Sequence, residues 1–411
     1  TNTPVGGAMR GYGIPQVCFA IESFMDDVAN EIHMDPLEFR RKNLIQGYYE
    51  DAYLKPIAAN TNGIFECLEK GAEYIHWDEK RKEYAEQTGD VRKGVGMALF
   101  SYKTGVWPIS LEIAGARLSL NQDGSVQLML GATEIGQGAD TVFSQMVAET
   151  LHTDMEHVHI KTVQDTDVSP FDTGAYASRQ SFVTGTAVRH CAEILRDKIL
   201  AYAKTLLPEI DTRELTLKDN WIWAGDEQAI SLAALAEESY YSLTNSSVLT
   251  AEVSEQVKKN TIATGCCFAE VEVDIKLGKI KILHIINVHD SGKLLNPQLA
   301  EMQVHGGMSM GMGYGISEQL ILDEKTGRPL NGNLLDYKLM TMLDTPDIKA
   351  DFVELCDPMG PYGNKALGEP PAIPCAPAIR NAVLHATGVA FYENPLTPQR
   401  LIDGFQKAGL I

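Results

Sequence analysis

The segment KALGEPP (residues 365–371) contains the residue of this sequence that is best suited to acid–base chemistry. Glu369 has apolar or small neighbours, and the two prolines after it should hold it in extended geometry. Desolvation in such surroundings should raise the pKa of the carboxyl group, as a general base working near neutral pH requires. The same glutamate could instead cap a helix that is expected over residues 376–386. Residue types alone leave both interpretations open.

Four segments have the layout of an extended stretch, a glycine-bearing loop and a helix. Free N–H groups at a helix start, with glycine allowing close approach, suit an anion such as phosphate. Four such loops, with side-chain amides at Gln137 and Gln303, would suit a long polar ligand held at several points. For any single loop, glycine at a fold corner is the preferred explanation. The loops are Arg10-Gly11-Tyr12-Gly13, Gly136-Gln137-Gly138, residues 174–180 and His289-Asp290-Ser291-Gly292.

Other active-site motifs match poorly. The sequence has no Walker A motif and no GxGxxG that opens a helix after a strand. GMSMG around Ser309 matches the GxSxG of serine hydrolases, but that motif needs a preceding strand and PQLAEMQVHGG predicts a helix. His157 and His159 alternate along a predicted strand and could form a metal pair, but no third ligand lies nearby in the sequence. We expect these two to be surface residues and His289 to be structural.

An amphipathic helix is predicted over residues 17–32. Its acids should lie on one side, and its apolar side should face the core. The apolar residues are Phe19, Ile21, Phe24, Met25, Val28 and Ile32. A second helix should follow, because Asp35 and Pro36 occur in the order of an N-cap and a first helical residue.

Further along, residues 60–92 are charged and helix-prone, and we expect the main boundary where they end. Alternating apolar and polar residues around Asp123-Gly124 and around Gly278 predict two hairpins. Between them, residues 186–206 predict a long helix with one buried face. The two similar hairpins suggest two related sheet-forming halves.

Composition limits the partners of the chain. Its 411 residues include 35 basic and 55 acidic side chains, so the net charge is −20. Nucleic acids and anionic membranes both favour a basic surface, and are therefore poor partners. No apolar stretch approaches the roughly 20 residues that span a bilayer. Seven cysteines without CxxC or zinc spacing indicate reduced thiols and a cytoplasmic protein.

Four motifs together resemble the molybdenum hydroxylases of the xanthine dehydrogenase and aldehyde oxidase type. TNTPVGGAMRGYGIPQ is similar to the family's NTP…AFRGFGxPQ, and GATEIGQG to GxxExGQG. SPFDTGAYASRQS resembles its Ser/Thr-rich pterin loop, and KALGEPPAIPCAPAIRNAV resembles KAVGEPP…AI. The motifs occur in the family's order along nearly the whole chain. The ending LTPQRLIDGFQKAGLI is most similar to bacterial xanthine dehydrogenase molybdenum subunits.

The resemblance implies an α+β fold, with two lobes of mixed sheets and packed helices. Residues 1–92 would be the C-terminal part of a first molybdopterin-binding domain with a helical linker, and residues 93–411 the second such domain. The implied cofactor is molybdenum-molybdopterin, in a bacterial enzyme the cytosine dinucleotide form. No protein side chain ligates molybdenum in this family.

The resemblance assigns roles to individual residues within each motif. Glu369 matches the glutamate that removes a proton from the hydroxyl group on molybdenum, and Tyr12 matches an aromatic residue that packs against the substrate ring. Gly174 and Ala175 match small residues that line the pocket. The positions that match cofactor contacts are Arg10, Gly11, Gly136, Gln137, Gly138, Ser178, Arg179, Gln180 and Gln303.

The implied reaction is hydroxylation of a purine-like N-heterocycle, such as xanthine or hypoxanthine, with water as the oxygen source. Hydride would pass to molybdenum, and electrons to partner subunits that carry iron–sulfur clusters and FAD. An aldehyde or another N-heterocycle such as nicotinate is the alternative substrate. Two rival functions are a non-catalytic subunit that completes another chain's pocket and a serine hydrolase that uses Ser309.

The sequence also departs from the family. Met9 and Tyr12 stand where the family often has phenylalanine, and the added hydroxyl of Tyr12 bears on substrate preference. The family's first cofactor half, with its GGGFGGK loop, would lie upstream of Thr1. The resemblance therefore implies that the upstream half of the molybdenum subunit is a partner of this chain.

Overall fold

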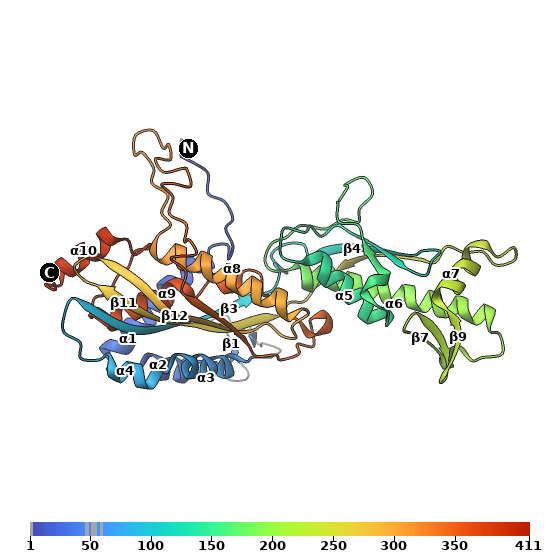
Figure 1. Cartoon of the computed structure of the whole chain (residues 1–411), viewed down its shortest axis with the longest axis horizontal. Coiled ribbons are helices and arrows are strands. Elements are labelled where there is room, and N and C mark those ends of the chain that lie inside the picture. Colours follow the sequence, from blue (N-terminus) through green and yellow to red (C-terminus); the bar gives the residue numbers. More distant parts are fainter. Residues whose placement is uncertain (1–2, 46–48, 51–55, 58–60) are drawn as a thin grey trace. The chain divides into compact units, whose positions relative to one another are not determined.

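The computed structural model describes residues 3–45, 49–50, 56–57 and 61–411, which form two compact units (Figure 1). Unit 1 comprises Thr1–Lys103, Thr261–Asp357 and Lys365–Ile411, and unit 2 comprises Thr104–Asn260 and Pro358–Asn364. The expected family division between residues 92 and 93 stays a prediction. No helix within the described residues is long and apolar enough to cross a membrane.

A four-stranded mixed sheet forms the centre of unit 1. Its strands lie in the order β13-β12-β11-β3. All neighbours are antiparallel except β12 and β13. The hairpin expected around Gly278 is confirmed, because Asp274 pairs with Lys279 across the β11–β12 turn. The strands are β3 (Val91–Lys103), β11 (Ile262–Asp274), β12 (Lys279–Asp290) and β13 (Asp347–Phe352).

Helices cover both faces of this sheet. On one face α3 (Ile64–Ile75) packs against Phe268 and Met97, and α4 (Trp77–Glu83) follows after a left-handed residue at His76. On the other face lie α8 (Pro297–Ile316) and α9 (Cys375–Thr387), and the chain ends with α10 (Pro398–Lys407). Figure 1 shows α3 and α8 on opposite sides of the sheet. A short antiparallel pair, β1 (Tyr49–Glu50) and β2 (Pro56–Ile57), completes this unit.

Glycines let the site-bearing elements approach closely. A Cβ atom at Gly96 of β3 would lie 2.1 Å from the backbone nitrogen of Ala382 in α9. A Cβ at Gly307 of α8 would lie 2.5 Å from Cβ of Pro371. The backbone of the KALGEPP segment therefore sits directly against α8.

The first helix, α1 (Ile14–Glu31), exists as predicted, but its covered side is not the expected one. Glu22 and Asp26 are buried, where they form ion pairs of 2.8 and 2.6 Å with Arg40 of α2 (Pro36–Asn43). By contrast, Ile21 and Phe24 are exposed. The assignment of the acidic side to solvent was wrong, because a buried guanidinium satisfies both carboxylates. Asp35 caps α2 as predicted, accepting hydrogen bonds from two backbone N–H groups.

Unit 2 contains a four-stranded sheet in the order β10-β4-β5-β6, with β5 and β6 parallel. The hairpin expected around Asp123-Gly124 is β4 (Ile113–Leu120) with β5 (Val126–Leu130). The predicted long helix is α6 (Gln180–Leu206), and Val188, Cys191 and Leu195 are fully buried on it. The remaining elements are α5 (Ala139–Leu151), β6 (Val158–Ile160), β10 (Thr250–Gln256) and the short 3₁₀ helix Met155–His157.

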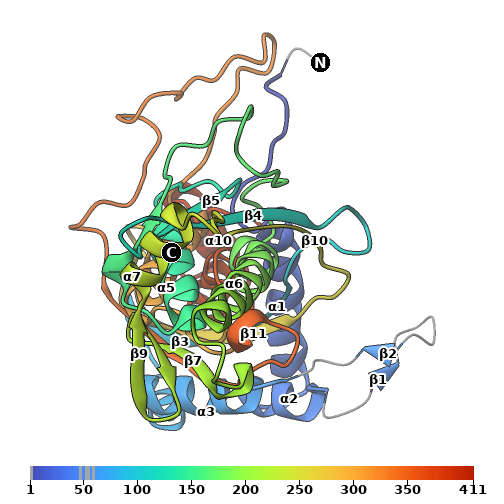
Figure 2. The same cartoon turned by 90° about the vertical axis from the view of Figure 1, so that its right-hand side faces the viewer.

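A small three-stranded antiparallel sheet, β7-β8-β9, extends unit 2. It consists of β7 (Leu215–Lys218), β8 (Trp221–Ala224) and β9 (Glu227–Ser231), followed by α7 (Leu232–Tyr241). Figure 2 shows it beside α6 and α7. The expected α+β architecture of mixed sheets with packed helices is confirmed.

Candidate functional site

Glu369 precedes a single 3₁₀ turn, Pro370–Ala372. Its backbone is right-handed helical, with φ −94° and ψ −35°, so the extended geometry expected from the following proline was wrong. The Ala372 N–H donates to the Glu369 carbonyl oxygen at 3.2 Å and closes this turn. Asn287 of β12 also donates to the Pro371 carbonyl at 2.9 Å.

The Glu369 carboxylate accepts hydrogen bonds from two distant segments of unit 1. Oε1 accepts the backbone N–H of Gly11 at 3.4 Å. Oε2 accepts the hydroxyl of Tyr102, which lies near the end of β3. The alternative role as a cap of α9 is not seen, since the N-cap of that helix is Pro374 and has no side-chain cap.

Arg10 connects the backbone of the KALGEPP segment to α8. Its Nε donates to the Gly368 carbonyl, and Nη2 donates to the Gln303 backbone carbonyl at 2.8 Å and to Gln303 Oε1 at 3.4 Å. Burial lowers the pKa of Arg10, although the negative charge of Glu369 opposes the shift. The structure therefore brings together Arg10, Gly11, Gln303 and Glu369, four of the residues predicted from the motifs.

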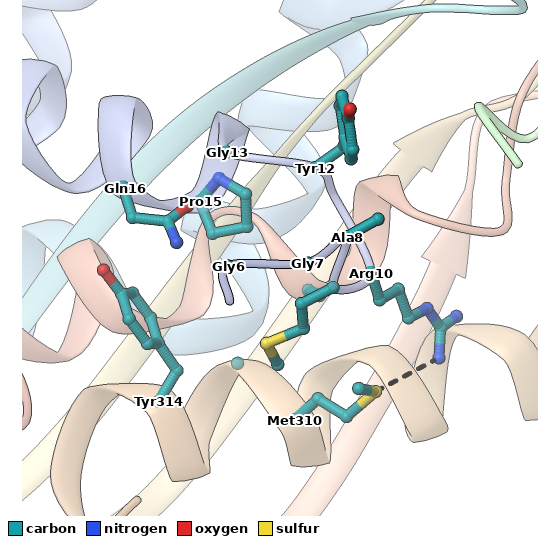
Figure 3. Close-up of a pocket in the computed structure, with 13 residues that line it drawn as sticks. Gly6, Gly7, Ala8, Arg10, Tyr12, Gly13, Pro15, Gln16, Met310 and Tyr314 are labelled. Atoms are coloured by element: carbon teal, nitrogen blue, oxygen red, sulfur yellow. Dashed lines mark hydrogen bonds between the residues drawn. The ribbon is translucent and has the colours of Figure 1, made fainter. Parts of the chain in front are cut away.

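A cavity of about 420 Å³ lies beside Arg10 in unit 1 (Figure 3). Figure 3 shows Arg10 pointing toward Met310 of α8, while the Tyr12 ring points away from that helix. Much of the wall is glycine backbone, and a Cβ added at Gly6, Gly7 or Gly13 would meet nothing within 4 Å. Tyr12 is a left-handed residue with φ 47° and an exposed side chain.

A buried ion pair anchors the start of the KALGEPP segment. Lys365 Nζ lies 2.8 Å from Asp290 Oδ2, and neither side chain is exposed. The same oxygen accepts the Gly63 N–H at 2.8 Å, and Lys365 also donates to the Thr61 carbonyl. Charges at this depth require such partners, so the pair fixes where the segment leaves the sheet.

His289 lies beside this pair and is completely buried. Its ring is 5.0 Å from that of Phe100, and neither ring nitrogen has a hydrogen-bond partner among the described residues. Burial, with a smaller contribution from the positive charge of Arg10, lowers the pKa of His289 to about 3. A neutral imidazole packed against an aromatic ring is consistent with the expected structural role.

In unit 2 the structure joins two other predicted residues. Gln137 Nε2 donates to Gln180 Oε1 at 2.7 Å, and both side chains also donate to the Thr133 carbonyl. The free helix start expected at this loop is occupied by Glu134, whose carboxylate accepts the N–H groups of Gly136, Gly138 and Asp140. That part of the anion-site expectation was wrong, because a side chain of the chain itself fills the N-terminus of α5.

The buried side chain of Arg179 stabilises the loop that contains Gly174. Its guanidinium is fully buried and pairs with Glu112 and with Asp172, and it donates to the Gly174 carbonyl at 3.0 Å. Ser178 is left-handed, with φ 48°. Ala175 is exposed to solvent, whereas the Arg179 side chain is completely buried. Cofactor contact by these residues stays a prediction.

The rejected motifs behave as expected, with one exception. Ser309 lies inside α8, so no strand precedes it and the GxSxG match is accidental. His157 belongs to the 3₁₀ helix and only His159 to β6, so the predicted alternation of both along a strand was wrong. Across the described part of the chain, no three His, Cys, Asp or Glu side chains are grouped to hold a metal ion.

Sequence reasoning missed Tyr102 and Glu134. Tyr102 occupies an inward position of an apolar strand, where a tyrosine is indistinguishable from core. Glu134 had a usable signal, since it stands four residues before Gly138, at the start of a helix. Acidic side chains at that place commonly accept backbone N–H groups.

Comparisons with known proteins give the family. Residues 1–44 and residues 70–346 each match a model described as molybdopterin cofactor-binding domain. The xanthine dehydrogenase molybdenum-binding subunit of Escherichia coli O157:H7 is 49% identical over 100% of this chain and 55% of its own length. An aldehyde oxidoreductase molybdenum-binding subunit of Escherichia coli K12 is 28% identical over 98% of this chain and 53% of its own. This chain therefore spans about half the length of these relatives.

Solved structures agree on the fold. Quinoline 2-oxidoreductase from Pseudomonas putida 86 and CO dehydrogenase from Oligotropha carboxidovorans each have a TM-score of 0.88 and 24% identity. Each comparison covers 98% of this chain and 53% of the other. The chain belongs to the molybdenum hydroxylases of the xanthine dehydrogenase and aldehyde oxidase type, as part of their molybdopterin-binding subunit.

Proposed function

We propose that this chain supplies the general base and part of the cofactor site of a hydroxylase that acts on a purine-like N-heterocycle, such as xanthine or hypoxanthine. One observation carries the proposal. Glu369, Gly11, Arg10 and Gln303 belong to a single hydrogen-bonded cluster, although its bonded partners lie up to 358 positions apart in the sequence. The family membership and the xanthine dehydrogenase relative at 49% identity support the choice of substrate class.

The residues present fit a molybdopterin cofactor. The cavity beside Arg10 has the volume of a small-molecule site, and its open glycine backbone leaves peptide groups accessible to a flat polar ligand. Residues of unit 1 that would hold the cofactor are Arg10, Gly11 and Gln303. When bound, the cofactor supplies the oxidising centre that takes two electrons from the substrate carbon. We propose the cytosine dinucleotide form.

The protein's own contribution is proton removal and orientation. Glu369 would take up a proton at a carboxylate oxygen, and the Tyr102 hydroxyl and the Gly11 N–H fix the plane of that carboxylate beforehand. Arg10 keeps a positive charge near it and ties the loop to α8. Tyr12, whose side chain is exposed, would contact the substrate.

Partners and place in the cell follow from the same proposal. Electrons would leave through subunits that carry iron–sulfur clusters and FAD, and the upstream half of the molybdenum subunit would complete the site. All seven cysteines are free thiols, which suits the cytoplasm. An aldehyde or nicotinate-like substrate is favoured instead if Tyr12, which replaces the common phenylalanine, disfavours purines.

The first experiment is metal and pterin content. The chain is purified with its native partners, and molybdenum is measured by elemental analysis together with pterin fluorescence. Near-stoichiometric amounts of both support the proposal. Their absence from an intact complex would leave a non-catalytic subunit, whose addition should raise the activity of a reconstituted complex without activity of its own.

The second experiment tests the base. Glu369→Gln in the assembled enzyme should lower kcat by about 100-fold or more, as expected for loss of a general base. Glu324→Gln, at an exposed position of the same unit, is the control and should leave kcat unchanged. Near-normal turnover of Glu369→Gln with full molybdenum content would remove Glu369 from the role of base.

A further inference from the structure

The side chain of Met310, on α8, lies between the cavity and the guanidinium of Arg10. It is half-buried and lines the cavity (Figure 3). Arg10 Nη1 donates to the Met310 sulfur at 3.9 Å, and a thioether sulfur is a weak acceptor. By contrast, Met308 and Met312 of the same helix are completely buried. A small solute that enters the cavity can therefore reach the sulfur of Met310 but not the sulfurs of these two neighbours.

Arg10 cannot change one of its contacts without disturbing the others. Nε donates to the Gly368 carbonyl, and Nη2 donates to the Gln303 carbonyl at 2.8 Å. Because the guanidinium is a rigid plane, a movement of Nη1 toward a new acceptor also displaces Nε and Nη2. Gly368 directly precedes Glu369, so a movement of Arg10 reaches the segment that carries this carboxylate.

Oxidation of the thioether creates such a new acceptor. Hydrogen peroxide transfers one oxygen atom to the sulfur, so the O–O bond of the peroxide breaks, an S=O bond forms and water is released. The sulfur loses two electrons, and the peroxide gains them. An N–H group approaches an oxygen acceptor to about 2.9 Å, whereas Arg10 Nη1 now lies 3.9 Å from the sulfur. Methionine sulfoxide reductases reverse the oxidation.

We propose that Met310 is a site of reversible sulfoxidation, and that its sulfoxide oxygen draws Arg10 away from Gly368 and Gln303 and so displaces Glu369. Peroxide then lowers the activity of the site, and reduction of the sulfoxide restores it. The loss of activity rests on the proposed function. The modification and the movement of Arg10 concern only residues of this chain, so each part of the proposal can be tested by itself.

The first measurement is peptide mapping of the assembled enzyme after treatment with hydrogen peroxide. Mass spectrometry should find sulfoxide at Met310 and at Met302, which is on the same helix and 56% exposed, before it appears at the buried Met308 or Met312. The proposal is overturned if Met302 is fully converted while Met310 stays unmodified.

Hydrogen exchange on the same samples tests the movement without any catalytic readout. Exchange should accelerate in residues 9–14 and 365–373 as Met310 is converted, because these segments carry Arg10 and its contacts. Residues 180–206 of α6, in unit 2, are the internal control and should not change. Unchanged exchange around Arg10 after complete conversion of Met310 would overturn the proposal.

Variants then assign the loss of activity to position 310. Complete conversion of Met310 should lower kcat of the wild type at least about tenfold, since small displacements of positioned groups have such costs. Met310→Leu has a similar volume but no sulfur, so peroxide should not change its kcat from its own untreated value. Met310→Gln places an amide oxygen near Arg10 and should lower kcat without peroxide. Met302→Leu is the matched control and should stay as sensitive to peroxide as the wild type.

Reduction completes the test. Methionine sulfoxide reductase with a thiol should restore kcat of the oxidised wild type together with unmodified Met310. The proposal is overturned if kcat stays low after Met310 is reduced. It is also overturned if Met310→Leu loses as much activity as the wild type, because the damage then lies at another group. If the complex does not hydroxylate a purine-like heterocycle, the mapping and exchange results still decide whether Met310 controls Arg10.

Discussion

Tyr102 of β3 donates its hydroxyl hydrogen to Oε2 of Glu369, across 267 positions of sequence. The tyrosine ring is buried in a small apolar cluster with Phe100, Ala263 and Ile373. A carboxylate held in this way is oriented before any ligand arrives. Orientation of a base in advance is a recognised source of rate enhancement.

Tyr102→Phe should therefore show how much of kcat depends on the orientation of the Glu369 carboxylate, because Glu369 itself is still present to accept the proton. The ring still packs, so the variant should lose about 1–2 kcal/mol of unfolding free energy for one hydrogen bond. In the assembled enzyme kcat should fall about tenfold, less than for loss of the base itself. The matched control is Tyr84→Phe, which removes a similar buried hydrogen bond, of 2.8 Å, to Glu270. Equal losses of kcat in both variants would show that Tyr102 acts through stability alone.

Lys365→Met tests the anchor of the KALGEPP segment. Removing one member of a fully buried ion pair leaves Asp290 without its counter-charge, so unfolding free energy should fall by about 3–5 kcal/mol. Lys70→Met is the control, because its 3.0 Å pair with Asp351 is exposed and should contribute less than about 1 kcal/mol. Urea unfolding of both variants gives the comparison. A cost below 1 kcal/mol for Lys365→Met would mean that water or another group replaces the lysine.

Arg179→Lys tests the buried support of the Gly174 loop. A lysine cannot pair with Glu112 and Asp172 and also reach the Gly174 carbonyl, so a loss of roughly 3 kcal/mol is expected. Hydrogen exchange should accelerate first in residues 172–180. Arg117→Lys, in an exposed pair with Glu252, should leave exchange in that loop unchanged. Unchanged exchange in Arg179→Lys would show that the loop does not depend on the guanidinium.

Local sequence patterns predicted α1, α2, the long helix α6, both hairpins and the cap at Asp35, because each depends on neighbours in sequence. They could not predict that Arg10 meets Gln303, or that Glu369 meets Tyr102, because those contacts depend on how β3, α8 and the KALGEPP segment stack. Motif matches supplied Arg10, Gln303 and Glu369 without their geometry.

The covered side of α1 was mispredicted for a related reason. Periodicity shows that a helix has two different sides, but it does not show which side meets the rest of the chain. Here two carboxylates are buried because Arg40, 14 and 18 positions away, satisfies both. The spacing of apolar residues along a helix contains no information about such a distant partner.

Glu134→Ala tests the start of α5 through pH. Burial alone would raise the pKa of Glu134, but hydrogen bonds from the backbone N–H groups of Asp140, Gly138 and Gly136 outweigh it, and the pKa is lowered. The carboxylate form therefore stabilises the folded state at neutral pH, by the roughly 1 kcal/mol usual for a helix cap. Because the folded-state pKa lies below the ordinary value of 4.5, this contribution is complete above 4.5 and is lost as pH falls through the lowered pKa.

Urea unfolding of wild type and Glu134→Ala should thus differ by about 1 kcal/mol at neutral pH, with the difference shrinking in acid. Glu149→Ala, at an exposed position near the end of the same helix, should show neither effect. A difference that stays constant through the acid range would mean that packing of the Glu134 side chain, rather than its charge, holds the start of α5.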